Sequence, residues 1–174
     1  GLGPHDADIA GMPDLDSLTI LPWRPNIAWL AGNIHVDGNP WRFCPRSILN
    51  SMRDKAAADG YVYKHGVEPE FFLVKRNETG GIDLADPLDI LDKPCYDQRT
   101  LSRNLDLLTS IIKHMQELGW NPYANDHEDA NCQFEINWEF DECLKTADRH
   151  TFYKYKVLTK EGRNGLTATF MAKP

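Results

Sequence analysis

The sequence predicts a mixed α+β fold, in which an antiparallel sheet carries carboxylates on one face and helices on the other. Short segments rich in branched and aromatic residues recur between Gly, Pro and Asn turns, as strands do. Longer segments repeat apolar residues at the spacing of an amphipathic helix. The chain has 174 residues, which is enough for one hydrophobic core with a small second lobe.

The first part of the chain predicts strands. Residues 1–16 are rich in Gly, Pro and Asp and predict a loop. Four strand-like segments follow, at 18–21, 27–30, 33–36 and 40–43. Asp37-Gly38 predicts a tight hairpin turn between the last two of these segments.

Three helices are expected. Pro45 suits the first turn of a helix whose apolar face recurs at Ile48, Leu49, Met52 and Ala56, and Gly60 ends it. A second helix carries an apolar stripe and ends before Gly119; the stripe is Leu101, Leu105, Leu108, Ile112, Met115 and Leu118. Thr146 is the expected cap of a last helix that runs to about residue 160.

Two acidic motifs lie in strand-like surroundings. Residues 61–75 predict a strand that carries Glu68 and Glu70, which share one face because residues i and i+2 of a strand point the same way. Glu128 and Glu135 belong to two further strands, 123–127 and 133–138, or to the turn between them, and a last strand covers 166–171.

Carboxylates in apolar surroundings are seldom left unpaired. If the two motifs meet, four carboxylates would suit a hard divalent cation, Mg²⁺ or Mn²⁺. A solvated acidic face is the competing interpretation of either motif alone. His127, next to Glu128, has a similar alternative, since a lone histidine is more often a packed or capping residue.

The composition excludes several classes of protein. A formal net charge of −7 argues against nucleic acid as a partner, since phosphate binding needs basic patches. No apolar run is long enough to span a bilayer, and no signal peptide is visible, so no membrane association is expected. The four cysteines are scattered without a CxxC pair, which predicts reduced thiols in a cytoplasmic protein.

Both acidic motifs resemble the metal-binding signatures of the glutamine synthetase family. The motifs are Glu68-Pro-Glu70 before Phe-Phe-Leu, and His127-Glu128 leading to Gln133-Phe-Glu135. Four further segments are similar to the type III-like bacterial branch, which also contains γ-glutamylmethylamide synthetase: Leu21-Pro-Trp-Arg24, Lys93-Pro-Cys-Tyr96, Thr146-Ala-Asp-Arg149 and Ala168-Thr-Phe-Met171. The resemblance implies the end of an N-terminal β-grasp domain in residues 1–40, followed by the N-terminal part of the catalytic domain in residues 41–174.

The resemblance also implies a reaction. It is the ATP-dependent amidation of the glutamate γ-carboxylate by ammonia through γ-glutamyl phosphate, with methylamine as the alternative amine. Glu70, Glu128 and Glu135 would hold the Mg²⁺ or Mn²⁺ ion that orients glutamate, and Glu68 would belong to a second ion beside the ATP phosphates. His127 and Gln133 would either contact the nucleotide or support the metal ligands from behind.

The sequence departs from the family pattern in two ways. Cys132 stands where the family usually has Gly, and Ala172 stands where Pro is usual. The family's later segments, a Gly-rich loop and a Met-His motif that complete the second metal site, are not in this chain. We therefore expect no catalytic residue within this chain and no activity from it alone, while the full-length parent would form a homo-oligomeric ring. A non-catalytic, truncated family member is the other interpretation.

Overall fold

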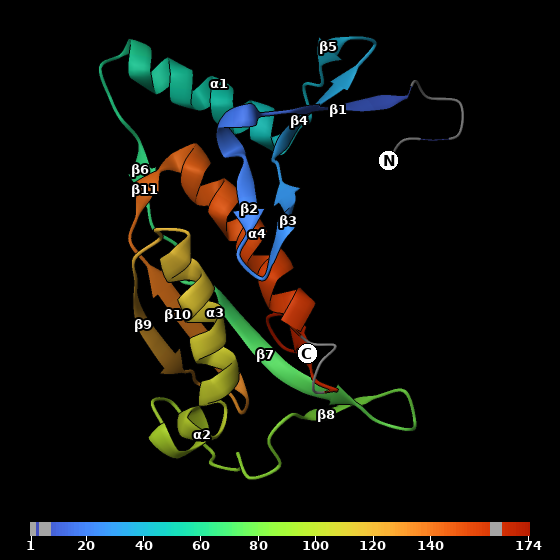
Figure 1. Ribbon diagram of the computed structural model, residues 1–174, viewed down its shortest axis with the longest axis vertical. Coiled ribbons are helices and arrows are strands. Elements are labelled where there is room, and N and C mark those ends of the chain that lie inside the picture. The colour runs from blue at the N-terminus through green and yellow to red at the C-terminus, as the bar shows by residue number, and fades with distance from the viewer. Residues whose placement is uncertain (1–2, 4–7, 161–164) are drawn as a thin grey trace. The chain divides into compact units, whose positions relative to one another are not determined.

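The computed structural model describes Gly3 and residues 8–160 and 165–174, and two compact units make up the chain (Figure 1). The first unit contains Gly1–His65 and Phe140–Arg149. The second contains Gly66–Glu139 and His150–Pro174. Helix α4, Cys143–Lys160, contributes residues to both units. Among the described residues, no helix is both long and apolar enough to cross a membrane.

The first unit is built from small sheets and one helix. A three-stranded sheet has the order β1-β4-β5, and β2 pairs with β3 in a separate hairpin. A short pair, β6 with β11, and helix α1 complete the unit. The bounds are β1 Ile9–Pro13, the 3₁₀ turn η1 Leu15–Ser17, β2 Thr19–Leu21, β3 Arg24–Trp29, β4 Gly32–Val36, β5 Asn39–Pro40, α1 Pro45–Ala58, β6 Lys64–His65 and β11 Asp141–Glu142.

Three expectations for the first unit are wrong in detail. Ile9–Pro13 lies in the predicted loop but forms β1, because it pairs antiparallel with β4 and so satisfies its backbone there. The strand expected at 40–43 is only β5, Asn39–Pro40, and a turn follows. Thr146 lies inside α4 and donates to the His65 carbonyl, while the Glu142 carboxylate accepts from the backbone at the start of the helix.

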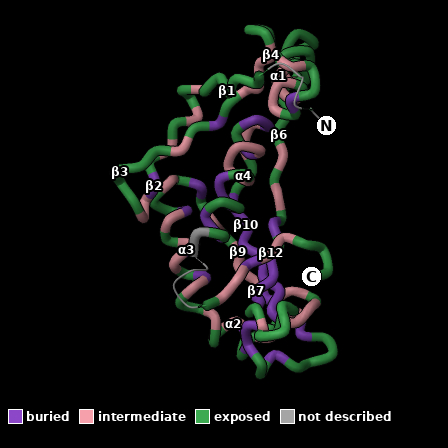
Figure 2. The backbone as a smooth tube through the Cα atoms, turned by 90° about the vertical axis from the view of Figure 1, so that its right-hand side faces the viewer, coloured by how far each residue is buried: buried purple, intermediate pink, exposed green. Residues whose placement is uncertain are grey.

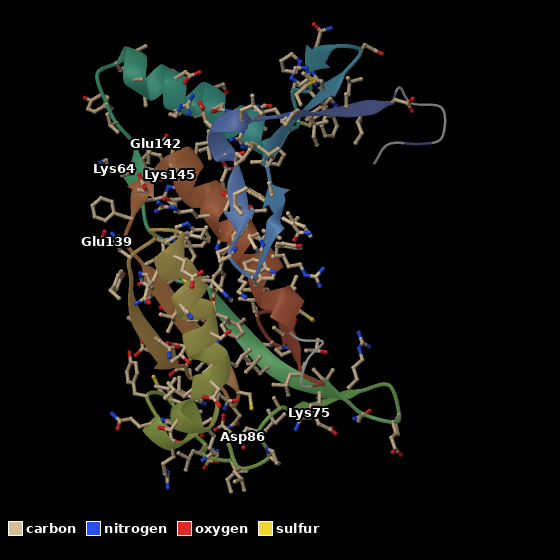
Figure 3. The ribbon with its side chains drawn as sticks, in the orientation of Figure 1. Lys64, Lys75, Asp86, Glu139, Glu142 and Lys145 are labelled. Carbon is tan, nitrogen blue, oxygen red and sulfur yellow. The ribbon has the colours of Figure 1, made fainter. Side chains whose placement is uncertain are left out.

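Several carboxylates of the first unit lie beside cationic side chains. The Arg46 guanidinium of α1 donates to Asp14 at 2.6 Å and to Asp148 at 2.8 Å. Lys145 lies 2.9 Å from Asp141, one turn earlier in the chain. Figure 3 labels Lys145 together with Lys64 and Glu142, which face each other in the β6–β11 pair. Each of these carboxylates therefore has a cationic neighbour.

The second unit is organised around one antiparallel sheet. The strand order is β12-β7-β10-β9, and β8 also pairs with β7. The bounds are β7 Glu70–Arg76, β8 Ile82–Leu84, α2 Gln98–Arg103, α3 Leu105–Glu117, β9 Pro122–His127, β10 Gln133–Trp138 and β12 Thr167–Thr169. The structure confirms the α+β class and the antiparallel sheet with flanking helices.

The buried residues concentrate along β7 and β10 (Figure 2). Phe71 stands opposite Phe134 in the ladder, and the ring of Tyr153, from α4, packs against Phe71 and Trp138. Helix α3 buries Leu108 and Met115 of the expected apolar stripe. The stripe is wrong at one position, because Ile111 is buried and Ile112 is only half-buried. These contacts leave one face of the sheet apolar and covered, and the polar side chains of β10 lie on the other face.

Four local expectations for the second unit also change. The strand expected over 61–75 divides into β6 and β7, and Glu68 precedes β7 because the intervening Pro69 has no backbone N–H to donate to a ladder. The single long helix divides at Asn104, whose φ of −101° and ψ of 6° are not helical. Strand β8 forms within a segment expected to be loop, and the last strand is shorter than 166–171.

Candidate metal centre

Three carboxylates converge at one end of the central sheet. Glu70 begins β7, Glu135 lies in β10 directly opposite Glu70, and Glu128 follows the last residue of β9. One oxygen from each of the three side chains lies within 4.8 Å of the others. The convergence follows from the antiparallel pairing of β10 with both β7 and β9.

The turn that carries Glu128 is held by hydrogen bonds at its base. The Glu128 N–H donates to the Gln133 carbonyl at 2.9 Å, and the Gln133 N–H donates to the Ala130 carbonyl at 3.1 Å. The Cys132 carbonyl accepts from the Leu73 N–H of β7 at 2.9 Å. The position of Glu128 is therefore tied to both neighbouring strands.

Strand β10 presents a polar stripe beside the cluster. Gln133, Glu135 and Asn137 alternate with apolar residues and share one face. The Gln133 side-chain amide donates to the Glu70 carboxylate, and the Asn137 amide donates to Glu135 Oε1 at 2.6 Å. Each amide thus orients a different carboxylate of the cluster.

The carboxylates of the cluster repel one another. Burial raises the pKa of Glu128, and the charges of Glu135 and Glu70 raise it further. Burial also raises the pKa of Glu135, against the Asn137 hydrogen bond that lowers it. In the part of the chain that the structure describes, no Lys or Arg forms an ion pair with these three side chains.

The donor set fits a hard divalent cation. Carboxylate oxygens are the ligands that Mg²⁺ and Mn²⁺ favour. Two oxygens bound to one Mg²⁺ at about 2.1 Å lie at most about 4.2 Å apart. The observed limit of 4.8 Å is close enough for side-chain rotation to complete the set. A cation would also relieve the repulsion that raises both pKa values.

The four residues predicted as metal ligands are not equivalent in the structure. Glu70, Glu128 and Glu135 come together, as the metal hypothesis requires. Glu68 is exposed, precedes β7 and is not among the three that converge. Its charge still acts on the cluster, because it helps to raise the pKa of Glu135.

His127 lies on the opposite face of the sheet from Glu135. It pairs with Phe134 in the ladder, and the two rings are 5.2 Å apart. The His127 side chain is fully buried, with Nε2 2.7 Å from Asp89 Oδ2 and Nδ1 2.9 Å from the Glu128 carbonyl. Both ring nitrogens therefore face protein acceptors.

Sequence reasoning missed Asp89 and Asn137. Asp89 stands in a segment expected to be loop, and nothing in its spacing links it to His127, 38 positions away. Asn137 had a local signal, because it continues the alternation of Gln133 and Glu135 along β10. The alternation alone would have placed its amide beside the cluster.

Cys132 adopts a conformation that favours glycine. Its φ is 58°, in the left-handed region, which costs a residue with a side chain about 1–2 kcal/mol. The side chain is fully buried, and its Sγ lies 3.3 Å from the Asp86 N–H; Figure 3 labels Asp86 in the loop after β8. Burial raises the pKa of the thiol to about 11, so it stays protonated and unreactive.

Comparison with known proteins finds one family. The model of the glutamine synthetase catalytic domain matches residues 42–174. A glutamine synthetase of Rhizobium leguminosarum bv. phaseoli is 46% identical over 99% of this chain, and a glutamate–methylamine ligase of Methyloversatilis universalis is 38% identical over 100% of it. A solved GmaS/ADP complex superposes with a TM-score of 0.92 at 48% identity, over 99% of this chain and 40% of its own. The chain spans 39% of the length of the two sequence relatives.

Proposed function

This chain belongs to the glutamine synthetase family, and we propose that it supplies part of the active site of an ATP-dependent ligase that amidates the γ-carboxylate of glutamate. The observation that carries the proposal is the convergence of Glu70, Glu128 and Glu135 within motifs that resemble the family's metal signatures. The cluster suits this reaction, because glutamate and ATP are both anions and a cation held by the cluster would reduce their repulsion.

In the proposed reaction, the glutamate γ-carboxylate attacks the γ-phosphorus of ATP, and the amine then displaces phosphate from γ-glutamyl phosphate. A bound Mg²⁺ or Mn²⁺ would neutralise charge on the reacting oxygens. Glu70, Glu128 and Glu135 would hold that cation, and Glu68 would face a second cation near the ATP phosphates. Gln133 would keep Glu70 oriented through the hydrogen bond that it donates.

His127 is proposed to support Glu128 rather than to contact the nucleotide. Its ring is buried and both of its nitrogens already face oxygens of this chain. A contact with ATP would require one of these hydrogen bonds to break. Gln133 is in a similar position, since its amide nitrogen donates to Glu70 and its amide oxygen accepts from the Ala130 N–H.

The amine is ammonia in the first form of the proposal and methylamine in the second. The 46% identical glutamine synthetase supports ammonia, and the 38% identical glutamate–methylamine ligase supports methylamine. Product analysis of the longest natural form of the protein, supplied with ammonia or with methylamine, decides between them. Amide formed only with methylamine would overturn the ammonia assignment.

The wider setting of the reaction is also a proposal. The family match that begins at residue 42 supports a boundary between a β-grasp segment, 1–40, and a catalytic segment, 41–174. A homo-oligomeric ring and a cytoplasmic location are proposed with the family, and four free cysteines suit a reducing compartment. Because the chain spans 39% of its relatives, we propose that it is inactive alone.

Calorimetric titration with Mn²⁺ tests the metal site in the 174-residue chain. We expect binding by the wild type and a loss of at least about tenfold in affinity for Glu70→Gln and for Glu128→Gln. Glu117→Gln removes the same charge from an exposed position of α3 and should bind as the wild type does. Wild-type chain that does not bind Mn²⁺, or equal affinity in all variants, would overturn the proposed site.

A further inference from the structure

Asp89 accepts hydrogen bonds from three residues of the turn that carries Glu128. It receives Nε2–H of His127 at 2.7 Å, the backbone N–H of Cys132 at 2.5 Å and the side-chain amide of Asn131 at 3.2 Å. Its own exposure is 1%, although its segment between β8 and α2 has no regular secondary structure. One buried carboxylate therefore gathers donors from both ends of residues 127–132.

The contacts continue from Asp89 to the main chain of Glu128. The His127 imidazole contacts the Asp89 carboxylate through Nε2 and the Glu128 carbonyl oxygen through Nδ1. The ring of His127 therefore lies between the Asp89 carboxylate and the backbone of Glu128. Further along the same loop, the Tyr96 N–H donates to the His127 carbonyl at 2.9 Å. The backbone on either side of the Glu128 Cα is thus held from the loop between β8 and α2.

Asp89 does not belong to the carboxylate cluster itself. His127 lies on the apolar face of the sheet beside Phe134, while Glu135 belongs to the alternate set of β10 residues that faces the other way. Asp89 is also not among the carboxylates whose oxygens converge. Its influence on a bound cation would therefore pass through His127 and the turn.

We propose that Asp89 is a positioning residue of the metal centre, which fixes the turn of residues 127–132 so that the Glu128 carboxylate meets those of Glu70 and Glu135. The inference rests on the proposed function, since it concerns the same cation. Partners that orient metal ligands in this way commonly contribute tenfold to a hundredfold to metal affinity. Buried hydrogen bonds that only stabilised the fold would have no such effect on the cation.

The test is a Mn²⁺ titration of the 174-residue chain, paired with a thermal melt without metal. Asp89→Asn keeps the shape of the side chain and removes its charge. We expect its Mn²⁺ affinity to fall tenfold to a hundredfold. Leu108→Ala, a buried truncation on α3, is the control: it should lower the melting temperature and leave the Mn²⁺ affinity unchanged.

A milder variant keeps the test decisive if Asp89→Asn does not fold. Asn131→Ala removes one donor to Asp89 and should weaken Mn²⁺ binding by a smaller factor, about twofold to fivefold. Wild-type affinity in both variants, or a loss in Leu108→Ala that matches theirs, would overturn the role of Asp89 and leave the metal site standing. A wild-type chain that binds no Mn²⁺ would overturn the proposed function and this inference together.

Discussion

Two groups of carboxylates in this chain have opposite electrostatic surroundings. In the first unit, Asp14 and Asp148 share the Arg46 guanidinium, and the hydrogen bond from Arg46 lowers the pKa of Asp14. In the second unit, Glu128 and Glu135 have raised pKa values, because burial and neighbouring carboxylates penalise their charges. One group contains its own cation, and the other contains only anions and amides.

The comparison separates a structural cluster from a candidate binding site. Arg46 connects residues that are far apart in the sequence, 14, 46 and 148, and gives both carboxylates a cationic partner within the unit. The pairing of β7 with β10 instead places Glu70 opposite Glu135, a like-charged pair that opposes folding. Such an arrangement is expected where an external cation supplies the missing charge.

The largest expected effect on stability comes from removing the Arg46 guanidinium. Arg46→Ala leaves Asp14 and Asp148 without their shared partner, and we expect the free energy of unfolding to fall by about 2 kcal/mol, less than for a fully buried pair. Urea denaturation of the 174-residue chain, followed by tryptophan fluorescence, measures the change in the free energy of unfolding. A loss below about 0.5 kcal/mol would show that the cluster adds little to stability.

Neutralising one carboxylate in each cluster should have effects of opposite sign. Asp14→Asn weakens a charged hydrogen bond and should destabilise the metal-free chain by about 1 kcal/mol. Glu135→Gln keeps an acceptor for Asn137 but removes repulsion, so it should stabilise the metal-free chain at pH 7 by about 1 kcal/mol. Urea denaturation of both variants measures the two changes in the free energy of unfolding. Destabilisation by Glu135→Gln would contradict the contrast between the two clusters.

The same contrast predicts opposite responses to acid. The lowered pKa of Asp14 means that its stabilisation is present above the pKa of the unfolded chain, about 3.9, and is lost as the pH falls through the lower folded value. The raised pKa values of Glu128 and Glu135 mean that repulsion is absent below about pH 4.3 and grows as the pH rises through the folded values.

Stability curves of the wild type and Glu135→Gln between pH 3 and pH 8 check this prediction. The two curves should coincide near pH 3 to 4 and separate as the pH rises, with the wild type less stable. Saturating Mn²⁺ should reverse the order of stability at pH 7, because the cation binds the intact cluster more tightly than the variant. Curves that stay parallel over the whole range would contradict the assigned repulsion.

The smallest effect concerns strain in the turn rather than charge. Cys132 has a positive φ, so Cys132→Gly relieves strain that Cys132→Ala retains. We expect the Gly variant to be more stable than the Ala variant by about 0.5–1 kcal/mol, although it loses more side chain. Thermal melts compare the two, and a more stable Ala variant would mean that packing of the side chain outweighs the strain.

The sequence predicted most of the second unit because its signals are local. Apolar periodicity predicted α3, and alternation predicted β10. The acidic motifs predicted the site at which Glu70, Glu128 and Glu135 converge. The missed strands β1 and β8 are short edge segments whose formation depends on a partner elsewhere in the chain. Asp89 was missed for the same reason, since its donors are 38 to 43 positions away.

The central claim is that three side chains of this chain hold one divalent cation. Crystals of the 174-residue chain grown with Mn²⁺ allow its position to be read directly from anomalous scattering. We predict a single strong peak at bonding distance, about 2.0–2.3 Å, from an oxygen of each of Glu70, Glu128 and Glu135. A map with no peak there, or with Mn²⁺ bound only at other residues, would contradict the account.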